Sequence, residues 1–233
     1  MKKKPTQFDF WYAVNNTKIV QPPRRHLETF GNTIINYRLI SELMDGVGKV
    51  RIREGRMQAL KPQIILPSSY ANLALEGFGE EAHKYMEWLK EHEDTVRILR
   101  YGYTLKQEAF SEQVVSDSVD AVLARVQSDN AVKEDPFSAV VQGVDDPWDV
   151  CLVRLFWTVI RNSASANIRE MNERHLFEMQ DGVPQAVRDE IETAFESATR
   201  DPALIKPLGK LLQDHGVFEL YQDRFFNLVQ GRG

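Results

Sequence analysis

The sequence predicts an α+β protein, with an antiparallel β-meander over about residues 8–66 followed by a larger, mostly helical part. Apolar residues alternate with polar ones as far as Leu66, whereas beyond Pro67 they recur at helical spacing. The charge changes at nearly the same place. Residues 1–62 hold twelve Lys and Arg against five Asp and Glu, and residues 63–233 hold seventeen against twenty-nine. We therefore expect a basic β-rich segment, residues 1–66, and an acidic helical segment, residues 67–233, packed as one compact unit.

The predicted strands are short and rich in aromatic and β-branched residues, as half-buried strands are. Asn15-Asn16 tolerates positive φ and predicts a two-residue turn between the first two strands. Pro22-Pro23 ends the second strand because proline cannot donate to a ladder. Glu54-Gly55 predicts a second hairpin tip, between the fourth and fifth strands. The predicted strands cover residues 10–14, 17–20, 33–39, 50–53, 56–60 and 64–66.

Three predicted helices begin with an aspartate followed directly by a proline: Asp135-Pro136, Asp146-Pro147 and Asp201-Pro202. An aspartate oxygen accepts the unpaired amide protons of a helix start, and proline loses nothing at the first helical position. Gly143 and Gly216 suit helix ends. Residues 95–103 fit a helix or a strand equally well. The other predicted helices cover residues 82–96, 119–126, 148–160, 184–199, 203–214 and 217–229.

A basic face is predicted on the hairpin at Glu54-Gly55, because side chains two residues apart share a strand face. Such a face is open to three interpretations: a solvated surface, a dock for acidic helices of this or another subunit, or a binding surface for nucleic acid or another polyanion. No RNP, zinc-finger or helix-turn-helix motif accompanies it. Its predicted members are Lys49, Arg51, Arg53 and Arg56, with Arg24 and Arg25 adding to the positive field.

A weak metal-site candidate lies on the helix predicted around residue 82. Glu80, His83 and Glu87 share one helix face, which is the form of half a carboxylate–histidine site. A complete two-metal site needs a second such motif, and the chain has none, so the main alternative is a solvated charged face. No metal or other cofactor is predicted.

The most apolar predicted helix, residues 148–160, contains the single cysteine, Cys151. A cysteine in such a helix behaves as a small buried hydrophobe, so we expect Cys151 to be inert. Arg154 interrupts the same stretch. It is expected either to pair with a distant carboxylate or to emerge on a narrow polar face with Thr158 and Arg161.

No catalytic residue can be named from local motifs. We expect a non-catalytic cytoplasmic interaction protein that binds itself or another protein, without a membrane span or a secretory signal. A nucleic-acid or polyanion binder using the basic hairpin is the first alternative. An enzyme whose site residues meet only in the fold is the second.

Overall fold

The computed structural model describes residues 10–64, 75–92, 101–102 and 105–231, and the chain divides into two compact units. The first unit consists of Met1–Pro62, Leu73–Leu99 and Tyr103–Asn167; the second consists of Gln63–Asn72, Arg100–Gly102 and Ile168–Gly233. Strands dominate the N-terminal part and helices the C-terminal part, so the predicted α+β class is confirmed. Each unit draws on separate stretches of chain, so neither coincides with the basic or the acidic segment.

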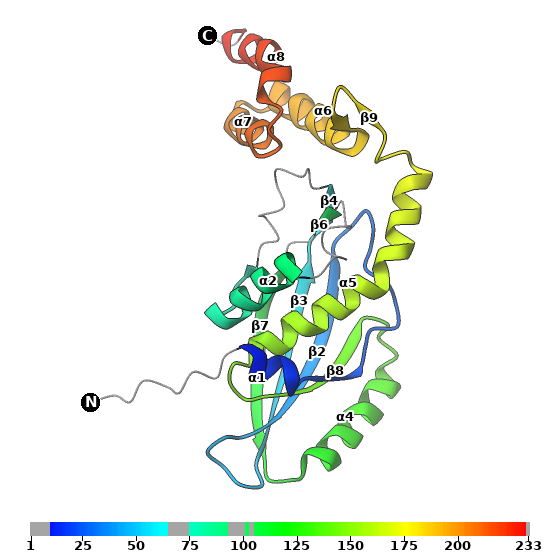
Figure 1. The fold of residues 1–233 in the computed structure, drawn as a ribbon, viewed down its shortest axis with the longest axis vertical. Helices are drawn as coiled ribbons and strands as arrows, with labels where there is room; N and C mark the ends of the chain where they lie inside the picture. The colour runs from blue at the N-terminus through cyan, green and yellow to red at the C-terminus, as the bar shows by residue number, and fades with distance from the viewer. Residues whose placement is uncertain (1–9, 65–74, 93–100, 103–104, 232–233) are drawn as a thin grey trace, which may run out of the picture. The chain divides into compact units, whose positions relative to one another are not determined.

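The first unit is built on a six-stranded mixed sheet in the order β1-β8-β2-β3-β7-β5. Figure 1 labels β8, β2, β3 and β7 of this sheet, lying side by side. β2, β3 and β7 pair antiparallel, as β1 and β8 do, whereas β8 runs parallel to β2 and β5 parallel to β7. The sheet is therefore more than a meander, because strands from later in the chain join it. The strands are β1 (Lys18–Gln21), β2 (Thr33–Glu42), β3 (Val50–Ala59), β5 (Leu75–Glu76), β7 (Leu105–Val115) and β8 (Ser138–Gly143).

Two helices pack on opposite faces of this sheet. Leu39 and Ile40 are neighbours on β2 and therefore point to opposite faces. Cys151 of α5 (Trp148–Glu173) lies on the Leu39 side, which we call the α5 face; a Cβ built on Gly143 would lie 2.6 Å from the Cys151 sulfur and 2.8 Å from Leu39 Cδ1. Ile40 packs on the other side, the α4 face, against Val122, Leu123 and Val126 of α4 (Val119–Lys133).

The first predicted strand is wrong, because residues 10–14 belong to helix α1 (Phe10–Asn15). α1 packs on α2 (Glu80–His92), where the rings of Trp11 and Trp88 meet edge to face at 4.7 Å. The aromatic residues that favour a strand in the sequence thus pack against a helix instead. The predicted hairpin at Asn15-Asn16 is also wrong, since these residues end α1.

The predicted hairpin tip at Glu54-Gly55 is wrong too, because β3 runs through both residues without a turn. A Cβ built on Gly55 would lie 2.6 Å from the Tyr37 hydroxyl oxygen and 2.6 Å from Phe110 Cβ. Gly55 therefore permits a close approach of neighbouring strands rather than a reversal. The chain reverses instead between β2 and β3, where Gly48 has a φ of +69°.

The three Asp-Pro pairs have different outcomes. Asp201-Pro202 opens the 3-10 helix η2 (Pro202–Leu204), and the Asp201 carboxylate accepts the Ala203 N–H at 2.9 Å, as predicted. Asp146-Pro147 stands directly before α5. Asp135-Pro136 leads into a turn before β8, so the helix predicted there is wrong. Gly143 ends β8 instead of a helix, whereas Gly216 follows helix α7 as predicted.

The second unit is mainly helical. The helices predicted at residues 184–199, 203–214 and 217–229 are confirmed as α6 (Gln185–Arg200), α7 (Ile205–Asp214) and α8 (Phe218–Gln230). Its buried side chains include Val187, Ile191, Phe195, Ala198, Leu208 and Leu212. Two short strand pairs belong to it: β4 (Gln63–Ile64) with β6 (Tyr101–Gly102), and β9 (Met179–Gln180) with β10 (Val183–Pro184). Residues 65–66 and 95–100, for which a strand or a helix is predicted, lie outside the described residues.

The apolar stretch at residues 148–160 forms the first part of α5, as predicted, and its apolar side chains are buried except for that of Trp148, which is partly exposed. Cys151 is 0% exposed. Arg154 and Thr158 are partly exposed, which places Arg154 on a narrow polar side of the helix. Among the described residues, no helix combines the length and apolarity that a membrane span requires.

Candidate functional site

In the first unit, strand β7 has one side that lacks a strand partner over most of its length among the described residues. β7 pairs with β3 from Leu105 to Val115, but β5 covers its outer side only at Leu105 and Lys106. Along residues 107–115, which we call the β7 edge, no strand among the described residues pairs on that side. Such an edge presents backbone N–H and C=O groups that can pair with another strand.

The β7 edge also exposes apolar side chains. Phe110 is 41% exposed and Val114 is 49% exposed. The Phe110 ring lies 4.7 Å from the ring of Trp148, the first residue of α5. Phe110 therefore points to the α5 face, and so does Val114, four residues further along the same strand. An unpaired strand with exposed apolar side chains is a template for association.

Behind the edge lies a buried arginine. Arg53 is 2% exposed and stands opposite Glu112 in the β3–β7 ladder. Its Nε donates to Glu112 Oε1 at 2.6 Å, its Nη1 to the Ser41 hydroxyl at 3.2 Å, and its Nη2 to the Asp145 carboxylate at 3.0 Å. The guanidinium carbon lies 5.0 Å from the centre of the Trp148 ring. A buried guanidinium needs such partners, because an unpaired buried charge is strongly destabilising.

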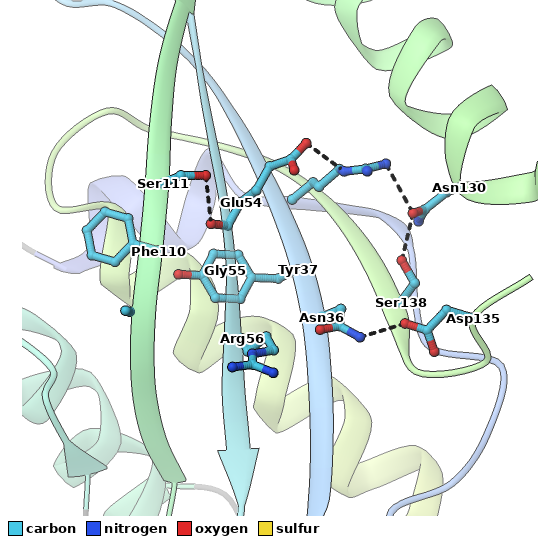
Figure 2. A pocket seen from close by; sticks show the side chains of 12 residues that line it. Asn36, Tyr37, Glu54, Gly55, Arg56, Phe110, Ser111, Asn130, Asp135 and Ser138 are labelled. Atoms are coloured by element: carbon cyan, nitrogen blue, oxygen red, sulfur yellow. Dashed lines mark hydrogen bonds and ion pairs between the residues drawn. The ribbon is translucent and has the colours of Figure 1, made fainter. Parts of the chain in front are cut away.

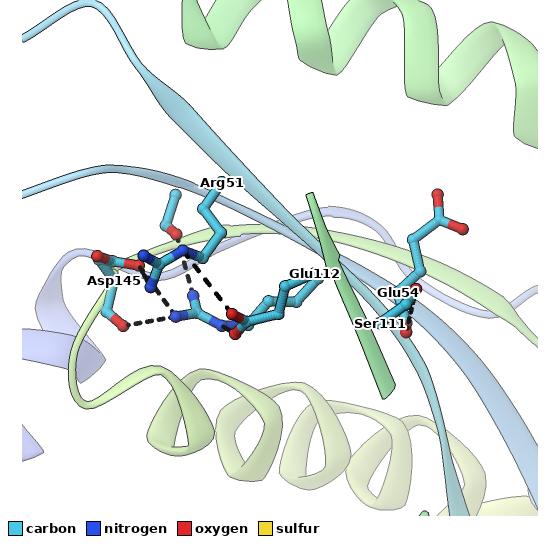
Figure 3. Close-up of polar contacts among 7 residues, drawn as sticks. Arg51, Glu54, Ser111, Glu112 and Asp145 are labelled. Carbon is cyan, nitrogen blue, oxygen red and sulfur yellow. Dashed lines mark hydrogen bonds and ion pairs between the residues drawn. The ribbon is translucent and has the colours of Figure 1, made fainter. Parts of the chain in front are cut away.

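Arg51 joins the same network from two residues earlier on the same strand (Figure 3). Its Nη1 donates to Asp145 Oδ1 at 2.9 Å, and its Nε lies 4.0 Å from Glu112 Oε2. Arg51 and Arg53 thus share two carboxylates, one from the β7 edge and one from the loop before α5. We call these four residues the Arg51/Arg53 network. Each positive charge of the network faces a carboxylate rather than open solvent.

The predicted basic face is not formed as a unit. Because β3 continues through Gly55, Arg56 points to the α4 face, opposite to Arg51 and Arg53, and pairs with Glu108 at 3.0 Å. Lys49 lies exposed in the turn between β2 and β3. Arg24 and Arg25 are exposed, and both backbone N–H groups donate to the Pro136 carbonyl. Of the six predicted residues, only Arg51 and Arg53 share carboxylate partners, whereas Arg24 and Arg25 share a backbone carbonyl elsewhere.

The candidate metal ligands lie at the start of α2. Glu80 pairs with Lys84 at 2.9 Å, and this contact lowers the pKa of the Glu80 carboxyl. His83 Nδ1 lies 2.9 Å from the Gly79 carbonyl oxygen, and Glu87 is exposed. Among the described residues, no group of three or more His, Cys, Asp or Glu side chains is arranged to hold a metal ion.

Burial raises the pKa of the Cys151 thiol, which disfavours the thiolate that a nucleophile requires. The inertness of Cys151 remains a prediction, now supported by its burial between Gly143 and Leu39.

Sequence reasoning missed the partners of the arginines. Glu112 and Asp145 lie 59 and 92 residues from Arg53, so no local spacing links them. The β7 edge was missed as well, since residues 107–115 are mostly polar and do not alternate clearly. The only sign of these carboxylate partners in the sequence is the excess of acidic residues beyond residue 62.

Comparisons with known proteins provide no relative from which a function could be transferred. No protein-family model matches the chain, and neither does any curated protein or solved structure at a significant level. The function must therefore be inferred from the β7 edge and from the Arg51/Arg53 network behind it.

Proposed function

We propose that this protein is a non-catalytic interaction protein that associates with a second copy of itself through the β7 edge. The observation that supports this proposal is the run of residues 107–115, which has no strand partner on its outer side among the described residues. Adding a strand to such an edge satisfies its backbone groups and is a common mode of protein recognition. The pairing of two identical edges about a twofold axis gives a closed dimer.

The sequence of the edge is nearly symmetrical about Glu112, which supports a second copy as the partner. In an antiparallel pair centred on Glu112, Phe110 of one copy lies opposite Val114 of the other, and Ser111 lies opposite Gln113. Both apolar pairs then fall on the α5 face, next to Trp148. Aromatic and β-branched residues in opposite positions are favourable cross-strand pairs.

The pairing brings the two Glu112 carboxylates close together, which is unfavourable for free carboxylates. Arg53 compensates for this charge, because it bonds Glu112 at 2.6 Å in each copy, and Arg51 lies 4.0 Å away. The Arg51/Arg53 network thus makes an acidic residue tolerable at the centre of the interface. It also argues against the polyanion alternative, since these two arginines already have carboxylate partners.

The proposal includes a reducing compartment such as the cytoplasm as the location of the protein. The single cysteine, Cys151, supports this part of the proposal, because the chain cannot form an internal disulfide.

Analytical ultracentrifugation of the full-length chain tests the proposed pairing. We expect a dimer for the wild type and, for Val114→Lys, a dimer dissociation constant raised at least about tenfold, because lysine blocks pairing at an edge. Val47→Lys is the matched control, since Val47 is fully exposed in the turn between β2 and β3. A wild-type monomer at high micromolar concentration, or equal dimerisation of Val114→Lys and the wild type, would refute the proposal.

A further inference from the structure

The α4 face of the sheet holds an open pocket that α4 leaves uncovered. It has a volume of about 560 Å³ and is lined by strands β2, β3, β7 and β8 together with the end of α4 (Figure 2). This volume falls within the range of small-molecule sites. Its lining includes Ala109, Phe110 and Ser111 of the β7 edge, whereas its polar side chains come mainly from β2, β3 and the residues around α4.

One amide in this pocket has an unmatched donor. Asn130 is 4% exposed, and its Oδ1 accepts from Arg38 Nη1 at 3.3 Å and from the Ser138 hydroxyl at 2.7 Å. A guanidinium can only donate, so the atom facing Arg38 must be the amide oxygen, which fixes the orientation of the amide. Asn130 Nδ2 is buried and has no hydrogen-bond partner among the described residues. A buried donor without an acceptor costs about 1–3 kcal/mol.

The charged side chains around the pocket already have hydrogen-bond or ion-pair partners. Arg38 Nε lies 2.8 Å from Glu54, and Arg56 Nε lies 3.0 Å from Glu108. The Asp135 carboxylate accepts one side-chain N–H and one backbone N–H. Asn130 Nδ2 is therefore an uncharged, unmatched donor, and the two arginines and three carboxylates around it leave one negative charge in excess. Such surroundings favour an uncharged acceptor oxygen over a carboxylate or a phosphate, whose charge would have no counterpart.

We propose that this pocket binds a small uncharged molecule that bears an amide or lactam carbonyl, whose oxygen accepts the N–H of Asn130 Nδ2. Glu54 supplies the complementary acceptor, because its side chain is 42% exposed while Arg38 contacts one of its oxygens. An amide or lactam N–H of the ligand donates to this carboxylate. Both polar ends of the ligand group are thereby recognised, and a molecule without the carbonyl leaves Asn130 unmatched.

Nuclear magnetic resonance of the ¹⁵N-labelled full-length protein tests the proposal directly, because the side-chain amide of Asn130 gives its own signals. Nicotinamide and uridine serve as uncharged carbonyl-bearing probes, and acetate and inorganic phosphate serve as charged ones. We expect nicotinamide or uridine at millimolar concentration to shift the Asn130 side-chain signals saturably, and acetate and phosphate to leave them unchanged. No shift with either uncharged probe, or a preference for the charged probes, would overturn the proposal.

A variant separates the donor from the rest of the site. Asn130→Asp keeps an acceptor oxygen for Arg38 and Ser138 but removes the Nδ2 donor, so we expect binding of the responsive probe to weaken at least about tenfold. Asn162→Asp makes the same chemical change at an exposed position of α5 and should leave binding unchanged. Wild-type affinity of a folded Asn130→Asp protein contradicts the proposal. If that variant does not fold, the wild-type titration alone decides.

Discussion

At the scale of single residues, the first unit can bury the positive charge of Arg53 because the guanidinium has hydrogen-bond and ion-pair partners around it. Arg53 is 2% exposed, and it reaches two carboxylates and a hydroxyl. Replacing one partner of a buried pair is more damaging than losing the attraction itself, because the remaining charges stay buried. The network therefore ties β3 to β7 and to the loop before α5 through side chains as well as through the backbone.

Arg53→Met should lower the free energy of unfolding by about 1.5–3 kcal/mol, because it removes one partner of Glu112 and of Asp145, whose side chains are 40% and 12% exposed, while Asp145 keeps Arg51. Arg56→Met is the control: its side chain is 60% exposed, so its ion pair with Glu108 is expected to contribute at most about 1 kcal/mol. Urea unfolding of both variants measures the difference. Equal losses in the two variants would show that Arg53 is no more important than a surface arginine.

Tyr37 provides a second residue-scale prediction. Burial raises the pKa of Tyr37 to about 12 from an ordinary value of 10.0. Since the folded-state pKa is the higher one, the stabilisation is complete below pH 10 and is lost as the pH rises towards 12. The loss amounts to about 2–3 kcal/mol at the alkaline end.

Tyr37→Phe removes this titration, so its unfolding free energy should change less between pH 9.5 and 11.5 than that of the wild type, on the order of 2 kcal/mol less. Urea titrations across this alkaline range measure the slope. Identical slopes for the two proteins would mean that Tyr37 ionises as freely in the folded state as in the unfolded chain.

At the scale of elements, the sequence predicts well where periodicity is local and strong. The helix at residues 148–160 is recognisable because it is apolar on nearly every side and follows Asp146-Pro147, and the C-terminal helices are recognisable because their apolar residues recur at helical spacing. Residues 10–14 are misread, because what decides their structure is packing on α2, about seventy residues away. The interpretation of Gly55 fails for the same reason: the side chains that require a glycine there, Tyr37 and Phe110, belong to β2 and β7.

Gly55→Ala should lower the free energy of unfolding by about 1–3 kcal/mol, because the new Cβ meets Tyr37 and Phe110 at 2.6 Å and forces one strand to move. Gly31→Ala is the matched control, since the nearest atom to a Cβ there is 3.8 Å away. Thermal or urea unfolding compares the two. A Gly55→Ala protein as stable as the wild type would mean that the β2–β3–β7 region yields more easily than this packing implies.

At the scale of the whole molecule, opposite charges of the two chain segments meet within the first unit, on β3, on β7 and in the loop before α5. Arg51 and Arg53 come from the basic segment, and Glu112 and Asp145 come from the acidic one. None of these pairings could be predicted from the sequence, because they depend on β7 lying beside β3 and on the path of the chain into α5. The composition of the segments indicates only that such pairs are possible.

We expect the protein to bind duplex DNA weakly and without steep salt dependence, since Arg51 and Arg53 are already paired. A surface that neutralises about four phosphates has a slope near −3 to −4 in a plot of log affinity against log salt. Fluorescence anisotropy with a labelled duplex at several salt concentrations measures this slope. Sub-micromolar binding with such a slope, abolished by combining Arg51→Glu with Arg53→Glu in a folded protein, would favour the polyanion binder instead.

The position of β8 has a consequence for synthesis of the chain on the ribosome. β8 lies between β1 and β2, and among the described strands it is the sole neighbour of β1. A nascent chain in which β2 and β3 have already emerged must therefore wait for residues 138–143, with one side of β2 uncovered and β1 unattached. Translation arrest before residue 138 should leave an intermediate that chaperones bind, whereas arrest well beyond residue 173 should release it from them.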